Sequence, residues 1–521
     1  MIQQWQARLN DLVASYERPD RGGLALGILK AGEEIRLAAG FADLEHGVKV
    51  TPQTPFHIAS LTKQFLAALV LDCEGRGLLS LDDDLKPRSP FLRHYHRPIT
   101  WRHLLSHTSG LLDTFDLLDL TGTTVETPIS TPDLDRALAQ LSHLNFEPGT
   151  GFVYSNTGFR VADAMLEDLT GQSLAELLRE RIFLPLGMHH TALEGDQTPT
   201  PRDAQPYWIT PDGPHPASHG LTMRGDAGLV STLDDLLLWE RHVLTTGQGR
   251  ALLDRLMTPT RYRNGVAGVY GLGCCTGTWR GLRCSGHGGL LPGIVSRVLR
   301  FPDQQCSILV LANSSDVNTN AVARAAAEIV LDLEPAPPPD PQWQHLSGHR
   351  FIDSRDEIIG VEQSPDGPRA HMHGWTIPLE PRPNGARIDD DVADRQLVET
   401  PSLTLLEWGQ HFPLTELTAD FPVTPLTGFA GSYANPELGV AYTMVPKDGA
   451  LWLHIAGSRG DKQHELTRLD TDLFMASDTE KWLPFQLTIR FLRDTRGAST
   501  HIRLNTGRTR GLLFARVKAT A

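Results

Sequence analysis

Hydrophobic and polar positions follow two different patterns along the chain, and the change falls near residue 335. Before it, apolar residues recur at the spacing of amphipathic helices in 60–73, 100–105, 131–144, 158–170, 174–182, 233–244 and 320–333. Strand-like runs lie at both ends of this part, as a hairpin within 24–43 and at 269–276, 295–301 and 307–312. This order predicts one antiparallel sheet with helices packed on it.

The second part follows a proline-rich stretch at 333–341, which predicts a stiff, extended linker. Beyond it, helical periodicity disappears, and short alternating runs separated by turn residues indicate β-structure. A weak repeat, with Leu346-Ser347-Gly348 matching Leu426-Thr427-Gly428, predicts two copies of one small module. Sheets of this size usually close to hide their edges. We therefore predict an α+β protein with a helix-flanked domain at 1–333 and two small antiparallel β-barrels at 343–420 and 426–521.

Length, charge and cysteine content restrict the class of protein. A chain of 521 residues is too long for a single core. A net charge of −14 argues against a nucleic-acid or anionic-membrane partner. No apolar run reaches the roughly 18–20 residues that span a bilayer, and the N-terminus lacks the pattern of a signal peptide. The five cysteines form a poor disulfide framework, so we expect a cytoplasmic protein with reduced cysteines.

A serine and a lysine three residues apart, Ser60 and Lys63, open the first long helical segment. A serine hydroxyl is a poor nucleophile at neutral pH and needs a base beside it. Residues i and i+3 share a face of a helix, so the Lys63 amine should lie next to the Ser60 hydroxyl. The apolar residues that follow predict a buried helix, and burial of Lys63 would lower its pKa and free its lone pair.

A second motif, Tyr154-x-Asn156, lies on a tight segment far downstream. A phenol near a lysine ammonium ionises more easily and can relay a proton to the leaving group. The Asn156 amide can hold either Lys63 or the substrate carbonyl.

The third motif, His287-Gly288-Gly289, is expected to precede a strand. The glycines would let a substrate backbone approach closely, and a neutral histidine can hydrogen-bond a tyrosinate or the leaving group. The backbone N–H groups of Leu290 and Ser60, the latter at a helix start, are the predicted oxyanion hole. Together the motifs predict a serine hydrolase that acts through an acyl-enzyme. With no His-Glu-x-x-His and no Cys-x-x-Cys, we expect no metal and no cofactor.

These motifs resemble those of the penicillin-recognising serine enzymes: class C β-lactamases, DD-peptidases and related esterases. Other members carry Ser-Asp-Asn and Lys-Thr-Gly, where this chain has Tyr-x-Asn and His-Gly-Gly. Segments 99–111, 180–188 and 225–232 also resemble the family, so the likeness covers about 20–333. It implies a β-lactamase-like domain, catalytic roles for Ser60, Lys63, Tyr154 and His287 with support from Asn156, and β-lactams as candidate inhibitors.

Within that group, the domain order and the His-Gly-Gly motif are most similar to the bacterial serine D-aminopeptidases, which carry two β-barrels after the catalytic domain. The resemblance implies an aminopeptidase that releases small N-terminal D-residues (D-Ala, Gly) from peptides, amides or esters. It also implies a homodimer, and a loop of the last barrel that brings an aspartate to the substrate. The best positional match for that aspartate is Asp478.

Two alternatives stay open at this point. The same scaffold hosts esterases, amidases and DD-carboxypeptidases, so the choice among them rests on analogy. A protein of another class, a penicillin-binding sensor, would be acylated but would never turn over. Stoichiometric labelling without turnover would distinguish it from an enzyme.

Overall fold

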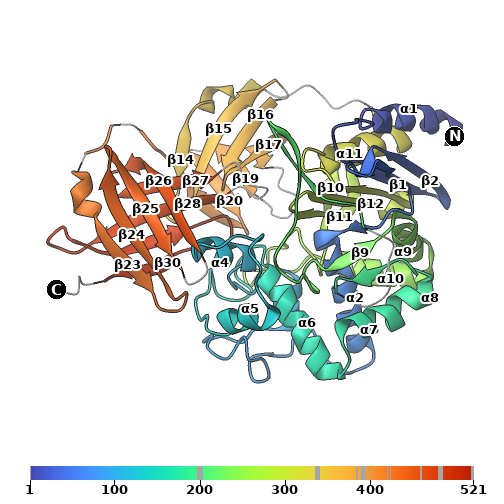
Figure 1. Cartoon of the computed structure of the whole chain (residues 1–521), viewed down its shortest axis with the longest axis horizontal. Helices are drawn as coiled ribbons and strands as arrows, with labels where there is room; N and C mark the ends of the chain where they lie inside the picture. Colours follow the sequence, from blue (N-terminus) through green and yellow to red (C-terminus); the bar gives the residue numbers. More distant parts are fainter. Residues whose placement is uncertain are drawn as a thin grey trace.

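The chain folds into a catalytic part and two β-sheet bodies, as a computed structural model shows (Figure 1). The structure describes residues 2–195, 203–334, 341–365, 367–382, 385–388, 395–399, 402–418, 420–422, 424–457, 460–478 and 485–517. Within these ranges, no helix is both long and apolar enough to cross a bilayer. None of the five cysteines, all of which are described, is joined in a disulfide.

A six-stranded antiparallel sheet forms the centre of the catalytic part, in the order β10-β11-β12-β13-β1-β2. Its strands are β1 (Leu24–Lys30), β2 (Glu33–Ala39), β10 (Cys275–Trp279), β11 (Leu282–Leu291), β12 (Ile294–Phe301) and β13 (Cys306–Ala312). The first and last strands in sequence lie next to each other, because Leu24 pairs with Ala312. The interior strands are almost continuously apolar, as expected of a sheet that is covered on both faces.

Helices cover the two faces of this sheet. α1 (Ile2–Ala14) and α11 (Thr319–Val330) pack on one face, where they share a core with the strands. The other face packs against α2 (Lys63–Gly75) and α9 (Leu233–Thr245). The remaining helices of this part are α3 (Trp101–Leu105), α4 (Thr114–Leu120), α5 (Thr131–Leu138), α6 (Asn156–Thr170), α7 (Leu174–Leu178), α8 (Leu184–Leu186) and α10 (Gly247–Met257).

Short strands complete the catalytic part. They are β3 (Phe41–Asp43), β4 (Val48–Lys49), β5 (Phe56–His57), β6 (Ala192–Leu193), β7 (Tyr207–Thr210), β8 (Gly213–Pro216) and β9 (Leu229–Ser231). β5, β9 and β6 form one three-stranded sheet, and β5 leads through a short 3₁₀ turn into α2.

Helix α5 is shorter than the predicted segment 131–144. It ends at Leu138, and the backbone N–H groups of Ser142 and His143 donate to the carboxylate of Glu437 in the last barrel. These N–H groups are therefore used in a contact between distant parts of the chain instead of a helix. A tertiary contact of this kind overrides a local helical pattern.

The tail forms two antiparallel β bodies with separate cores. The first is a nine-stranded sheet that nearly closes: β14 (Arg350–Ile352), β15 (Ile358–Ser364), β16 (Gly367–Met372), β17 (Trp375–Arg382), β18 (Gly385–Ile388), β19 (Arg395–Glu399), β20 (Leu403–Glu407), β21 (Gln410–Pro413) and β22 (Thr415–Glu416). The second is a closed barrel: β23 (Gly431–Asn435), β24 (Val440–Lys447), β25 (Ala450–Ala456), β26 (Asp461–Asp470), β27 (Leu473–Asp478), β28 (Phe485–Arg493), β29 (Ser499–Asn505) and β30 (Leu512–Arg516).

The predicted α+β fold class, with a catalytic domain followed by two small barrels, is confirmed. A short helical turn precedes each β body, Pro341–Leu346 and Leu426–Phe429, but Leu346-Ser347-Gly348 begins at the last residue of the first turn, whereas Leu426-Thr427-Gly428 lies within the second. We propose the ranges 1–333, 343–420 and 426–521 as the three domains.

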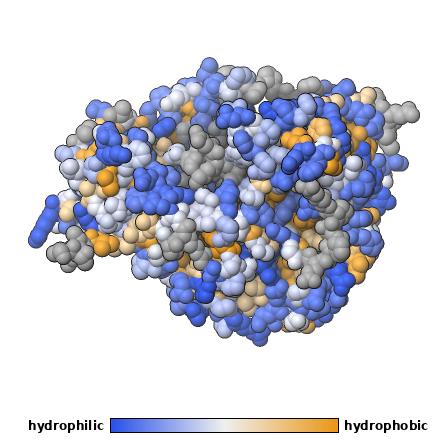
Figure 2. All heavy atoms as spheres, in the orientation of Figure 1, coloured by the Kyte–Doolittle hydropathy of each residue, from blue (hydrophilic) through white to orange (hydrophobic). Residues whose placement is uncertain are grey.

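The closed barrel lies beside α4 of the catalytic part (Figure 1). Its Tyr442 hydroxyl donates to the carbonyl of Leu120, and its Lys462 ammonium pairs with Asp119 at 2.7 Å. Polar residues cover most of the face seen in Figure 2, where hydrophobic residues form small separate patches. The arrangement brings barrel loops close to the helices that carry the sequence motifs.

Candidate active site

The predicted nucleophile, Ser60, lies in a tight 3₁₀ turn, Ala59–Thr62, between β5 and α2. The prediction placed it on the first turn of the α-helix, but α2 itself begins at Lys63. In a 3₁₀ turn, residues i and i+3 eclipse one another, so the two side chains meet. Lys63 Nζ lies 3.1 Å from Ser60 Oγ. The preceding Ala59 has a φ of 48°, a left-handed conformation that a non-glycine residue rarely adopts.

Lys63 is completely buried, and its surroundings suit a neutral amine. Nζ donates to Asn156 Oδ1 at 2.8 Å and to the backbone carbonyl of Asp226. These two acceptors take both hydrogens of a neutral amine, so its lone pair is left facing the Ser60 hydroxyl. Burial lowers the pKa of Lys63 from 10.5 to about 7. The amine is therefore able to accept the Ser60 proton near neutral pH.

The Lys63 pKa sets an expected pH dependence. Activity requires the deprotonated amine, so kcat/KM should fall about tenfold per pH unit below about pH 7 and level off above it. The measurement is kcat/KM for an amide substrate from pH 5 to 9, with circular dichroism confirming that the fold persists. A kcat/KM that stays constant from pH 5.5 to 8 would contradict Lys63 as the base.

Tyr154 lies just before α6, which begins at Asn156, two residues earlier than predicted. Its side chain hydrogen-bonds Ser60, and its ring centre lies 5.0 Å from Lys63 Nζ. Burial raises the pKa of Tyr154 above its usual value, so the phenol is protonated at rest and can donate to a developing charge.

The buried His107, which the sequence analysis did not single out, supports Tyr154. The two ring centres are 4.1 Å apart, and His107 Nδ1 accepts a hydrogen bond from Ser155 N at 3.0 Å. Burial lowers the pKa of His107, so the ring is a neutral acceptor. His107 stands in the family-like segment 99–111, which was the available signal.

The third motif lies within a strand, not before one: β11 spans Leu282–Leu291. The His287 ring lies 5.9 Å from that of Tyr154, and its Nε2 is 2.8 Å from the hydroxyl of Tyr270. Burial raises the pKa of Tyr270, so this phenol keeps its proton and can donate a hydrogen bond to His287 Nε2. Tyr270 was missed because it stands in an ordinary strand-like run.

Glycines bring β11 directly against the nucleophile turn. A Cβ at Gly289 would fall 2.5 Å from the carbonyl oxygen of Ile58, so only glycine fits there. The register of β10 with β11 ends at the pair Cys275–Gly286. The part of β11 after Gly286, which includes Gly288 and Leu290, therefore extends beyond the residues of β11 that pair with β10. The oxyanion role of Ser60 N and Leu290 N stays a prediction.

Residues from a distant part of the chain adjoin this site. Asp113, which caps α4, accepts hydrogen bonds from Asn156 N at 2.6 Å and from Arg508 Nη1 of the closed barrel at 3.0 Å. Neither Asp113 nor Arg508 was predicted, and no sequence pattern joins two residues 395 positions apart. Asp478 is the last residue of β27, but its side chain and the loop 479–484 lie outside the described residues.

A cluster of His57, Glu194 and His219 lies behind the nucleophile turn, with candidate ligand atoms within 4.8 Å of one another. A histidine binds a metal through an unprotonated ring nitrogen. His57 Nδ1 accepts a hydrogen bond from Ala59 N at 3.2 Å, so a neutral His57 carries its proton on Nε2, the atom facing Glu194. In this form His57 does not offer Nε2 to a metal, and that atom lies 3.6 Å from the carboxylate of Glu194.

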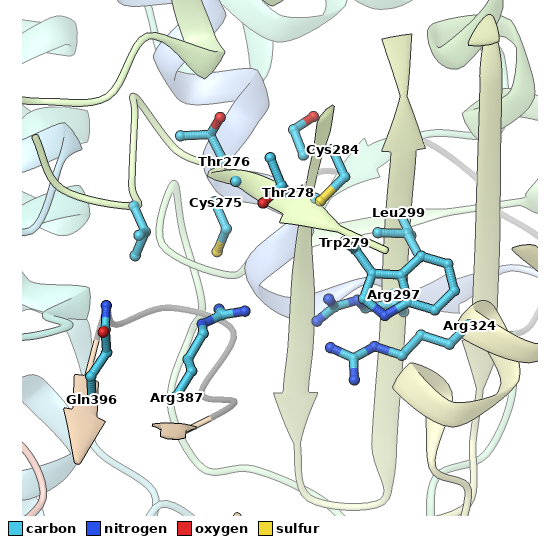
Figure 3. A pocket seen from close by; sticks show the side chains of 14 residues that line it. Cys275, Thr276, Thr278, Trp279, Cys284, Arg297, Leu299, Arg324, Arg387 and Gln396 are labelled. Carbon is cyan, nitrogen blue, oxygen red and sulfur yellow. The ribbon is translucent and has the colours of Figure 1, made fainter. Parts of the chain in front are cut away.

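A separate pocket of about 330 Å³ lies where the edge strand β10 faces the nine-stranded sheet (Figure 3). Arg387 and Gln396 of β18 and β19 face Cys275 and the rest of β10 across it. None of Ser60, Lys63, Tyr154 and His287 lines it, although Cys275 also packs in the cluster that includes Tyr154.

Residues 8–332 match the family described as beta-lactamase. Two curated relatives match almost end to end. The D-aminopeptidase of Gluconobacter oxydans is 28% identical over 99% of this chain and all of its own length, and that of Brucella canis is 27% identical over 98% of each chain. Both matches therefore extend over the two β bodies of this chain as well as its catalytic part.

Solved structures show a similar fold. The octameric penicillin-binding protein homologue from Pyrococcus abyssi has a TM-score of 0.56 and 18% identity, covering 98% of this chain and 99% of its own. The D-amino acid amidase from Ochrobactrum anthropi SV3, complexed with D-phenylalanine, has a TM-score of 0.54 and 23% identity, covering 63% of this chain and 99% of its own.

Proposed function

This chain belongs to the beta-lactamase family, and we propose that it is a D-aminopeptidase within it, a serine hydrolase that releases small N-terminal D-residues from peptides, amides or esters. The observation that carries the proposal is the buried Lys63 amine, whose Nζ lies 3.1 Å from Ser60 Oγ. The end-to-end match to D-aminopeptidases supports the choice of substrate.

In the proposed reaction, Lys63 Nζ takes the Ser60 proton as Oγ attacks the substrate carbonyl carbon. The tetrahedral oxyanion is held by the backbone N–H groups of Ser60 and Leu290. As the C–N bond breaks, Tyr154 passes a proton to the leaving amine, while His287 and Tyr270 hold the phenol in place. Water then attacks the acyl-Ser60 ester while Tyr154 takes a proton from that water, and Lys63 returns its proton to Oγ as the C–O bond to Ser60 breaks and the amino acid leaves.

The proposed substrate carries a free α-ammonium, which requires an acidic partner in a closed site. Asp113 is not available for this role, because Arg508, Asn156 N and Phe115 N occupy its oxygens. We therefore propose that Asp478, at the end of β27, supplies the carboxylate. Gly288 and Gly289 would accept the substrate backbone along β11.

A substrate panel tests the proposed function. D-Ala p-nitroanilide should be cleaved with a kcat/KM at least 100-fold above that of L-Ala p-nitroanilide. N-acetylation of the D-Ala substrate should lower kcat/KM by a similar factor. An acyl ester, a D-Ala-D-Ala peptide and the β-lactam nitrocefin complete the panel. Preference for N-blocked substrates or simple esters would favour the esterase or carboxypeptidase alternative instead. Labelling of the protein without any turnover would favour the penicillin-binding sensor.

We also propose that the protein works in the cytoplasm as a homodimer, by its resemblance to the D-aminopeptidases. Five cysteines without a disulfide among the described residues support a reducing compartment. β-Lactams are proposed as inhibitors, because a strained amide can acylate Ser60 whether or not it turns over.

A further inference from the structure

A cation from the closed barrel lies against the predicted catalytic tyrosine. Arg508, in the loop 506–511 between β29 and β30, has its Cζ 4.9 Å from the ring centre of Tyr154. Its Nη1 donates to Asp113 Oδ1 at 3.0 Å. Asp113 is fully buried and about a quarter of the Arg508 side chain is exposed, so solvent screens the pair only in part.

Several hydrogen bonds fix the loop that carries Arg508. The carboxylate of Asp116 on α4 accepts from Arg508 N at 2.9 Å and from the hydroxyls of Thr506 and Thr509. Asn145 donates to the carbonyl of Arg508 at 3.0 Å and accepts from Arg510 N at 2.7 Å. Because both ends of the loop are tied to the catalytic part, the guanidinium is held in one place.

The other groups around Lys63 and Tyr154 do not supply a fixed positive charge. His107 is neutral because it is buried, and Nε2 of His287 lies 2.8 Å from the hydroxyl of Tyr270, which keeps its proton. The charged and titratable groups that act on Lys63 or Tyr154 from the surrounding elements are Ser60, His107, Asp113, Asp226, Tyr270, Cys275, His287 and Arg508. Arg508 is the only arginine among these described groups.

We propose that Arg508 is a positioning residue of the active site: its fixed charge, delivered by the closed barrel, holds Lys63 and Tyr154 in the state that accepts the Ser60 proton. The same guanidinium, through Asp113, fixes the backbone of Asn156, which in turn holds Lys63. The C-terminal barrel is then part of the catalytic unit and not only a wall around it. This inference rests on the proposed role of Ser60, Lys63 and Tyr154.

The charges of Arg508 and Asp113 determine in which direction the pH profile of each variant should shift. A nearby positive charge disfavours the ammonium of Lys63 and favours a developing tyrosinate, whereas the carboxylate of Asp113 acts in the opposite direction. Removing the guanidinium should therefore strengthen proton binding by Lys63 and Tyr154, and it should move the acid limb of the pH profile to higher pH. Removing the Asp113 charge should move it to lower pH. A purely structural contact would lower activity in both cases without these opposite shifts.

The experiment measures kcat/KM for D-Ala p-nitroanilide, and the rate of Ser60 labelling by a fluorophosphonate, from pH 5 to 9. Arg508→Gln should shift the acid limb of both profiles up by about one unit, which lowers both rates about tenfold at pH 6 and much less at pH 9. Arg508→Lys should restore most of the profile, because it returns the charge. Asp113→Asn should shift the limb downward.

Arg503→Gln is the matched control. It removes an arginine of β29, outside the loop 506–511, that pairs with Asp356 and makes no contact with Tyr154 among the described residues, so the acid limb should stay in place. An unchanged acid limb in Arg508→Gln, or an equal shift in Arg503→Gln, would overturn the inference. Wild-type protein that is not labelled at Ser60 would instead overturn the proposed function. Melting temperatures of all variants separate instability from the pH effect.

Discussion

Ser60→Ala is expected to lower kcat for D-Ala p-nitroanilide by a factor on the order of 10⁶. Among the described residues, Ser60 Oγ is the only hydroxyl that is hydrogen-bonded to the buried Lys63 amine, so we expect no other nucleophile to replace it in the acyl-enzyme route. The loss should fall on kcat, because the substrate pocket keeps its shape. Steady-state kinetics with a sensitive fluorogenic amide would measure the residual rate.

Ser89→Ala is a suitable control for this variant, since Ser89 is a buried serine outside the site. It should retain wild-type kcat, and both variants should melt within a few degrees of the wild type. Activity of Ser60→Ala within tenfold of the wild type would exclude the acyl-enzyme route through this residue.

Lys63 and Tyr154 are expected to act as one proton-transfer unit. Lys63→Ala and Tyr154→Phe should each lower kcat by roughly 10²–10⁴-fold, because each removes a group in contact with Ser60. The double variant should be little worse than the worse single variant, since either loss already breaks the proton path. A double-mutant cycle on kcat measures the coupling.

Losses that multiply in the double variant would show that the two groups work independently. A Lys63→Ala variant that unfolds would not decide the question, so Lys63→Met, which fills most of the same volume, is the second choice. Its melting temperature should exceed that of Lys63→Ala, because it leaves no cavity beside α6.

Local features of the site could be predicted from the sequence, because they depend on short spacings. The meeting of Ser60 and Lys63 follows from an i, i+3 relation, which holds in the observed 3₁₀ turn as well as in an α-helix. The buried helix that lowers the pKa of Lys63 was visible as a continuous apolar run. The division into a helix-flanked sheet and an all-β tail followed from periodicity alone.

Long-range contacts were not predictable in this way. Asp113 and Arg508 meet because a barrel loop docks on α4, and neither residue stands out in its own segment. Tyr270 reaches His287 across a turn and an edge strand, which no spacing rule describes. The end of α5 depends on Glu437, almost 300 positions away. In each case the deciding group comes from another part of the chain.

We expect Ser60 to form a covalent acyl-enzyme, which mass spectrometry of the labelled protein can detect. The wild-type protein is incubated with a fluorophosphonate or a slowly hydrolysed β-lactam, quenched in acid and digested. One adduct per chain should appear, on the peptide that contains Ser60, and none in Ser60→Ala. An adduct on any other residue, or none at all in a preparation that still cleaves D-Ala p-nitroanilide, would contradict it.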